Sequence, residues 1–152
     1  MECFKTFRKA PPSQLIMTLL VKNEESMLEE NLLFHKAMGV DSFIITDNNS
    51  TDSTPEIIRK YKQKGWIKEV IEEKATDYEQ KEWVDRMIWK AKTIYKADWI
   101  INADADELWY SPSGNLKTDL SATHANVLNC EMRSVYPEEN RPFWQWDKVV
   151  KP

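Results

Sequence analysis

The chain has 152 residues, of which 41% are hydrophobic and 30% are charged, and its formal net charge is -4 at pH 7. This length and composition are typical of one globular domain with a hydrophobic core, and they exclude a disordered or fibrous protein. The weakly acidic balance, and the lack of a basic stripe interleaved with aromatic residues, argue against nucleic acid as a partner.

Membrane segments and disulfides are not expected either. The longest apolar run, around 15–21, is far too short to span a bilayer, and the first residues lack the apolar core of a signal peptide. Cys3 and Cys130 stand in unlike contexts and belong to no ligand-type pair, which argues against a disulfide or a zinc site. We therefore predict a cytoplasmic protein with reduced cysteines and no transmembrane segment.

Strand-like and helix-like segments alternate along most of the chain. Residues 1–12 show no periodicity and are expected to form an N-terminal arm. Thr54 is predicted to cap the second helix, with Pro55 at its first helical position. The predicted strands are 14–22, 42–46, 66–71 and 99–101, and the predicted helices are 24–38, 55–64 and 77–96. This alternation predicts an α/β fold with a doubly wound, mostly parallel, Rossmann-like sheet flanked by helices.

The pattern is less regular after the fourth strand. We expect a short helical turn at 116–122, a further strand at 126–135, and an irregular aromatic tail at 136–152. No linker or repeat divides the chain, so residues 1–152 are predicted to form a single domain.

Three carboxylates directly follow the fourth predicted strand. Asp104 and Asp106 are two residues apart, so in an extended segment both side chains point to the same side and can share one hard cation. Glu107 comes next, and the carboxyl end of a strand is where open α/β sheets bind ligands. An EF-hand loop is excluded, because it would need Gly at the place of Trp109 and Glu at that of Asn115. The pattern predicts a Mg²⁺ or Mn²⁺ site.

Three polar segments, each placed after a predicted strand, resemble the family 2 glycosyltransferases, which have the GT-A fold. They are Asn23-Glu24-Glu25, the run Asp-Asn-Asn-Ser-Thr-Asp at 47–52, and Asp104-Ala105-Asp106. Glu107 and Trp109 are most similar to the bacterial subgroup with an Asp-x-Asp-Glu motif. The resemblance covers roughly residues 15–120, and three motifs in the right order are far more specific than any one alone.

The resemblance implies metal-dependent transfer of a sugar from a UDP- or GDP-linked donor to a saccharide or to a lipid- or protein-linked acceptor. It implies Asp106 as the direct ligand of Mn²⁺ or Mg²⁺, and Asp104 as a contact to the ribose or to a metal-bound water. The expected donor-binding residues are Asn23, Glu24, Asp47, Asn48, Arg86 and Asp104. Asn48 stands where relatives commonly have a second Asp, so recognition of the base would fall to Asp47 or to the Asn48 amide.

The catalytic base is not identified by the sequence. Glu138, Glu139 and Asp147 are the acidic residues available, with no positive argument for any of them. Because relatives continue well beyond this length, the chain is alternatively expected to be the N-terminal, nucleotide-sugar-binding half of a longer protein. A non-catalytic binding module is therefore a second interpretation.

A third interpretation, a sugar-phosphate nucleotidyltransferase, ranks lower, because the segment after the first strand is acidic and has no glycine. Other residues are assigned no chemistry. His35 is predicted to be a packed or surface histidine rather than a ligand, Trp83 a core residue, and Lys90 part of a solvated helix face. Glu107 is expected either to assist the cation site or to hold neighbouring backbone.

Overall fold

The computed structural model describes residues 13–74, 80–123, 127–128, 130–136, 138–142 and 145–146. Its elements, in chain order, are β1 (Leu15–Val21), α1 (Leu28–Ala37), β2 (Ser42–Asp47), α2 (Thr54–Gln63), β3 (Ile67–Glu72), α3 (Gln80–Thr93), β4 (Trp99–Ala103) and α4 (Leu116–Ser121). Among the helices in these ranges, none has the length and apolar character needed to cross a bilayer.

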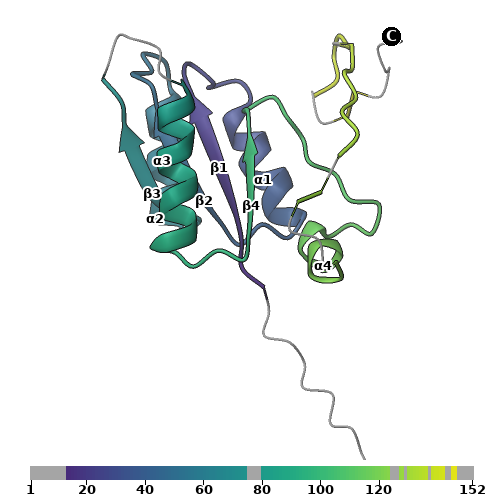
Figure 1. Ribbon diagram of the computed structural model, residues 1–152. Helices are drawn as coiled ribbons and strands as arrows, with labels where there is room; N and C mark the ends of the chain where they lie inside the picture. The colour runs from purple at the N-terminus through teal and green to yellow at the C-terminus, as the bar shows by residue number, and fades with distance from the viewer. Residues whose placement is uncertain are drawn as a thin grey trace, which may run out of the picture.

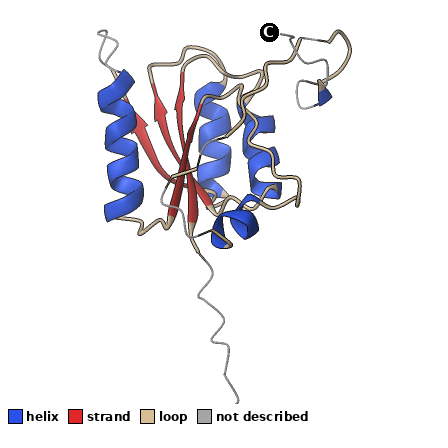
Figure 2. Cartoon of the chain, turned by 45° about the vertical axis from the view of Figure 1, so that its right-hand side comes forward, coloured by secondary structure: helices blue, strands red, loops and turns tan. Residues whose placement is uncertain are grey.

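The four strands form one parallel sheet in the order β3-β2-β1-β4. Helices α1 and α2 lie on one face of the sheet and α3 covers the other (Figure 1, Figure 2). The predicted doubly wound, parallel α/β fold is confirmed, and the first four predicted strands each have a counterpart in the sheet.

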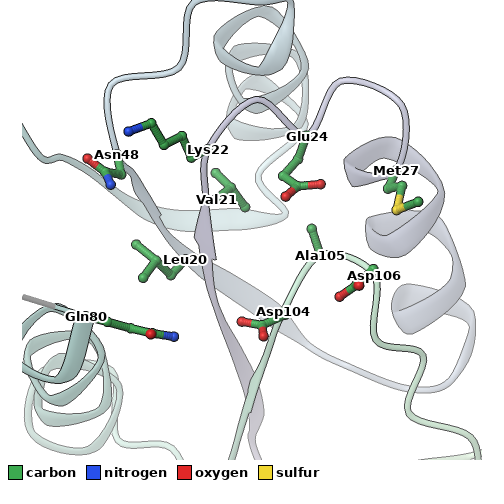
Figure 3. A pocket seen from close by; sticks show the side chains of 10 residues that line it. All are labelled: Leu20, Val21, Lys22, Glu24, Met27, Asn48, Gln80, Asp104, Ala105 and Asp106. Atoms are coloured by element: carbon green, nitrogen blue, oxygen red, sulfur yellow. The ribbon is translucent and has the colours of Figure 1, made fainter. Parts of the chain in front are cut away.

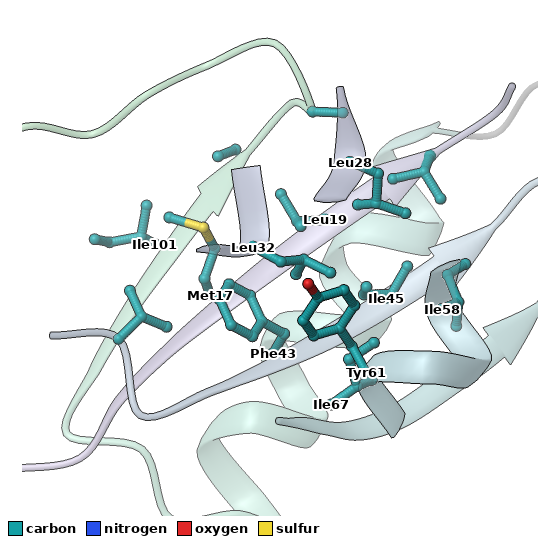
Figure 4. Packing of buried hydrophobic residues seen from close by; sticks show 14 of the residues in the cluster. Met17, Leu19, Leu28, Leu32, Phe43, Ile45, Ile58, Tyr61, Ile67 and Ile101 are labelled. Carbon is teal, nitrogen blue, oxygen red and sulfur yellow. The ribbon is translucent and has the colours of Figure 1, made fainter. Parts of the chain in front are cut away.

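Strand β1 is paired along both edges and buried on both faces, because helices pack on either side of the sheet. Met17 and Leu19 point into the cluster shared with α1 and α2, whereas Ile16 points toward Met87 of α3 (Figure 4 shows the first cluster). All four side chains are 0% exposed. Full burial of such a side chain contributes about 1.5–3 kcal/mol, which explains why a nearly continuous apolar run forms a central strand.

Two helix starts differ from the sequence-based expectation. Helix α1 begins at Leu28 rather than at residue 24, because the backbone N–H groups of Met27 and Leu28 both turn back to the carbonyl of Glu24. Helix α2 begins at Thr54 itself, with Ser53 at the N-cap position, so the predicted capping role of Thr54 is wrong. The Thr54 hydroxyl instead accepts a hydrogen bond from the backbone N–H of Glu24, at 2.8 Å. A tertiary contact thus replaced the local cap.

The further strand predicted at 126–135 is also wrong for the residues that can be described there. Residues 127–128 and 130–136 contain no strand, and Val135 makes only an isolated bridge. Val127 and Met132 are 84% and 83% exposed. These apolar residues have β propensity, but no sheet edge pairs with them. The expected arm at 1–12 lies outside the described residues, as does part of the aromatic tail.

Helix α4 fixes the segment after β4 to the body of the fold, as the expected helical turn at 116–122. The Asn115 side chain caps it by accepting the backbone N–H of Thr118 at 2.9 Å, and the backbone N–H of Leu116 donates to the carbonyl of Met38 at 2.8 Å. This brings Asn115 against Gly39, which ends α1 with a φ of +95°.

Two glycines give a matched test of that contact. Gly39 and Gly65 both follow a helix with positive φ, but a Cβ at Gly39 would lie 2.7 Å from Asn115 Oδ1, whereas nothing lies within 4 Å of one at Gly65. We expect Gly65→Ala to cost about 1 kcal/mol through backbone strain alone, and Gly39→Ala to cost at least about 1 kcal/mol more through overpacking. Urea unfolding of both variants measures the difference. Equal losses would mean that the Asn115 contact does not constrain Gly39.

Candidate functional site

The order of the strands creates a crevice between the ends of β1 and β4. The chain leaves β1 for α1 on one face of the sheet and enters β4 from α3 on the other face. The connections therefore diverge at the carboxyl ends of these two strands, which is where open α/β sheets bind ligands. Leu19 pairs with Ala103, so Asp104 begins immediately beyond the last pair of the β1–β4 ladder.

A pocket of about 440 Å³ occupies this position (Figure 3). Its polar lining consists of the carboxylates of Glu24, Asp104 and Asp106, the amides of Asn48 and Gln80, and the ammonium group of Lys22. The alternation of buried and exposed residues in β4 continues into the Asp-x-Asp motif: Ala103 and Ala105 are buried, whereas Asp104 and Asp106 are exposed. The two aspartates therefore share one side of the segment, as their spacing predicts.

Three carboxylates line this pocket, those of Glu24, Asp104 and Asp106 (Figure 3). Burial raises the pKa of Glu24, and the negative charges of Asp106, Asp52 and Asp104 raise it further. Mutual repulsion of this kind is relieved by a bound cation. Within the described ranges, however, no three His, Cys, Asp or Glu side chains form a complete metal-binding group. Any divalent ion here would thus need ligands from a bound molecule or from water.

Asn48 is the buried polar group of the pocket. The residue is 4% exposed, and its backbone N–H donates to the carbonyl of Val21 at 2.9 Å. Its side-chain amide lines the cavity and makes no hydrogen bond with any group in the described ranges. The amide is not among the polar atoms sealed from solvent without a partner in the described ranges, so it is open to the cavity and available to a ligand there.

Asn23 was expected to bind the donor, but it does not line this pocket. Its Oδ1 accepts the backbone N–H of Thr51 at 2.8 Å, and its own N–H donates to Ser50 Oγ at 2.9 Å. A second pair of bonds joins the same loops, since Glu25 N–H donates to Asp52 and Ser53 N–H donates to Glu25. The first two motifs of the resemblance therefore hold each other together.

Asp47 and Arg86 are likewise directed elsewhere. Asp47 Oδ1 accepts the backbone N–H of Ser50 at 3.1 Å and its hydroxyl at 2.6 Å, and the residue borders a second pocket of about 420 Å³ next to β3. Arg86 pairs with Glu73 at 2.7 Å, and Lys90 pairs with Glu69 rather than forming part of a solvated face. Neither cation lines the pocket between β1 and β4.

Asn31 was not expected at the site, yet from α1 it contacts the backbone of residues 104–107, which we call the acidic segment. Its Nδ2 donates to the carbonyls of Ala105 at 2.9 Å and Glu107 at 3.0 Å. Next to it, His35 is fully buried and accepts the backbone N–H of Trp109 at 2.9 Å. The sequence did carry one signal for these two residues: both are polar and stand one helical turn apart among leucines. Glu107 holds backbone, with its Oε2 3.4 Å from the N–H of Asp104.

Of the candidate bases that the structure describes, neither Glu138 nor Glu139 lines the pocket. Glu138 pairs with Arg141 at 3.1 Å and Glu139 is exposed. Asp147 lies outside the described residues. Trp83 is a core residue, as predicted, at 4% exposed.

Comparison with known families agrees with this geometry. The model of glycosyltransferase family 92 matches residues 17–143, which is most of the chain. The chain belongs to glycosyltransferase family 92. The predicted enzyme class is thereby confirmed, whereas the resemblance to family 2 in particular is not. No curated protein matches the sequence significantly.

Two solved structures share the fold of this family 92 chain. The mannosyltransferase PcManGT from Pyrobaculum calidifontis, in complex with GDP-Man and Mn²⁺, has a TM-score of 0.50 and 18% identity over 67% of this chain and 30% of its own. TarS from S. aureus has a TM-score of 0.51 and 17% identity over 72% of this chain and 19% of its own. The chain thus spans less than a third of either protein.

The buried histidine predicts a specific dependence of stability on pH. Burial lowers the pKa of His35 to about 4, from 6.5. Because only the unfolded state is protonated between these values, the contribution of His35 to stability is complete above pH 6.5 and is lost as the pH falls toward 4. We expect this group to cost about 2 kcal/mol between pH 6.5 and pH 5. Urea unfolding of wild type and His35→Gln at both pH values tests this, and equal losses would contradict it.

Proposed function

We propose that the pocket between β1 and β4 binds a nucleoside-diphosphate sugar through a divalent cation, and that the protein transfers the sugar to an acceptor. The observation that carries the proposal is the gathering of Asp104, Asp106 and Glu24 with the unpartnered Asn48 amide around one cavity. Family 92 membership supplies the reaction class, and the cavity supplies the chemistry that such a donor needs.

Mn²⁺ or Mg²⁺ is the cation that these residues fit. Both ions take oxygen ligands in octahedral geometry and are commonly bound by one or two carboxylates, with phosphate oxygens and water completing the shell. The two aspartates on one side of the acidic segment suit that ligand set, and the absence of a complete protein cage within the described ranges agrees with it. We assign Asp106 as the direct ligand and Asp104 as a contact to the ribose or to a metal-bound water. The Mn²⁺ and GDP-Man of the PcManGT structure support the same choice.

When bound, the cation neutralises the negative charge that develops on the diphosphate leaving group as the bond to the sugar breaks. The chain's own groups hold the donor for that step. Lys22 is the cationic side chain that lines the pocket, and it offsets the charge of a diphosphate where three carboxylates would repel it. The Asn48 amide has both a donor and an acceptor to offer to the base or ribose.

A second candidate function is donor binding without turnover by this chain. The observation that favours it is that the chain spans 30% and 19% of the two structures whose fold it shares. Metal-dependent nucleotide binding is common to both candidates, and transfer to an acceptor or hydrolysis of the donor distinguishes them.

Calorimetry tests the cation site. We expect UDP or GDP to bind wild type only with Mn²⁺ present, and Asp106→Asn to weaken that binding at least about tenfold, because it removes a charged ligand without changing shape. Asp98→Asn is the matched control. Asp98 precedes the opposite end of β4, where its carboxylate accepts the N–H of Gln14 at 2.7 Å, a bond that an amide oxygen can also accept.

Binding that is independent of Mn²⁺ would contradict the proposed cation site. An equal loss in Asp106→Asn and Asp98→Asn would also count against it, because the effect would then come from net charge alone. If the cation site holds, incubation with nucleotide sugars decides between transferase and binding module.

Because the Asn48 amide lines the pocket without a partner in the described ranges, we expect its removal to change nucleotide affinity but not folding stability. We expect Asn48→Ala to weaken nucleotide binding about fivefold to tenfold, a cost of about 1–1.4 kcal/mol for one lost hydrogen bond. The same change should leave the free energy of unfolding nearly unchanged, since the amide is open to the cavity and makes no hydrogen bond within the described ranges. Calorimetry and urea unfolding of one preparation measure both. A loss of stability without a loss of affinity would show that Asn48 serves the fold.

A further inference from the structure

Two polar residues lie where a helix normally places apolar side chains. Asn31 and His35 are one turn apart on α1, and both are 0% exposed. They lie on the buried face of the helix, together with Leu28 and Leu32 of the core. Burying an amide and an imidazole is costly unless their hydrogen bonds are made. Within the described ranges, the hydrogen bonds of these two side chains end on α1 itself or on the backbone of residues 104–109.

The Asn31 amide is satisfied by the acidic segment. Its Nδ2 lies 2.9 Å from the carbonyl of Ala105 and 3.0 Å from that of Glu107, and the carbonyl of Asp104 is 3.5 Å away. The two N–H groups of an amide thus meet the carbonyls on either side of Asp106. The Oδ1 of Asn31 lies 2.9 Å from His35 Nδ1.

The contacts of His35 determine its tautomer. Nδ1 faces two oxygens, the backbone carbonyl and the Oδ1 of Asn31, both at 2.9 Å, so Nδ1 carries the proton. Nε2 then offers its lone pair to the backbone N–H of Trp109, at 2.9 Å. The low pKa caused by burial keeps the ring neutral at pH 7, as this arrangement requires.

The acidic segment has few other constraints. Its remaining hydrogen bonds in the described ranges are local ones between Asp104 and Glu107. The Ala105 side chain is buried in the core cluster, and the carboxylates of Asp104 and Asp106 face the pocket (Figure 3). The Ala105 methyl and the bonds from α1 together fix which way the carboxylates point.

We propose that Asn31 and His35 are positioning residues that hold the backbone of residues 105–109 so that Asp104 and Asp106 can share a cation; the proposal rests on the proposed function. They act through main-chain bonds and touch neither the cation nor the donor. Their contribution is preorganisation: the cation meets carboxylates already in place, and no binding energy is spent on ordering the segment.

Asn31→Asp tests the amide, because it keeps the shape and the acceptor for His35 but replaces the donor with an oxygen facing two carbonyls. Mn²⁺ is titrated in the presence of UDP or GDP, with free Mn²⁺ followed by electron paramagnetic resonance. We expect affinity for Mn²⁺ to fall at least tenfold. Met87→Ala is the control, since it removes a buried side chain from the α3 face and lowers stability without contacting the acidic segment. It should leave the affinity unchanged. Equal affinity in Asn31→Asp and wild type would overturn the proposal.

His35 is tested by exchange of the Trp109 amide hydrogen, which requires no ligand. We expect this hydrogen to be protected in wild type, and to exchange at least tenfold faster in His35→Leu, which has no acceptor. His35→Gln should restore protection, because its amide oxygen can accept the same bond. Rapid exchange in wild type, or equal exchange in His35→Leu, would overturn the proposal.

The two readouts separate the two proposals. If wild type binds neither Mn²⁺ nor nucleotide, the proposed function fails, and the inference fails with it as a statement about a cation site. If wild type binds both while Asn31→Asp does so equally well, the proposed function stands and only the positioning role is lost.

Discussion

The pairing of β1 with β4 is the contact on which the site depends. Leu15 to Leu19 pair in register with Trp99 to Ala103, and this ladder brings residues more than 80 positions apart in the sequence side by side. Since the chain leaves β1 on one face and reaches β4 from the other, the strand ends stay uncovered and Asp104 and Asp106 project into the gap. A different strand order would separate the acidic segment from Glu24 and Asn48, and the pocket would lose its charge.

The polar residues in the loops around this gap fall into two groups: those that hydrogen-bond one loop to the other, and those that line the cavity. Asn23, Glu25, Asp52 and Thr54 form a set of bonds between the β1–α1 and β2–α2 loops. Their neighbours Glu24 and Asn48 are left free to line the pocket. Rigid loops of this kind reduce the entropy lost when a ligand binds, so bonds that have no part in the chemistry still affect affinity.

The acidic segment after β4 has charged side chains of the pocket on one side and buried polar residues of α1 on the other. On the solvent side, the carboxylates repel one another and raise the pKa of Glu24 together with burial. On the core side, Asn31 and His35 bind the backbone that carries them. The hydrogen bonds from α1 fix the course of this backbone. A cation in the pocket would offset the negative charge around Glu24.

The sequence alone determined the α/β architecture and the position of the acidic segment after β4. Short, mostly apolar runs at 15–21 and 42–46 indicated strands covered on both faces, and the two-residue spacing of Asp104 and Asp106 placed both carboxylates on one side. Local chemistry decides such features. Which motif residues face the cavity was decided largely by tertiary structure, because Asn23 found a partner in Thr51 of another loop and Arg86 found one in Glu73. Asp47 differs, since its bond to Ser50 is a local one within its own loop. The burial of Asn31 and His35 also has a tertiary origin: a polar side chain tolerates a core position only when the fold brings backbone groups to it, and no local pattern encodes that encounter.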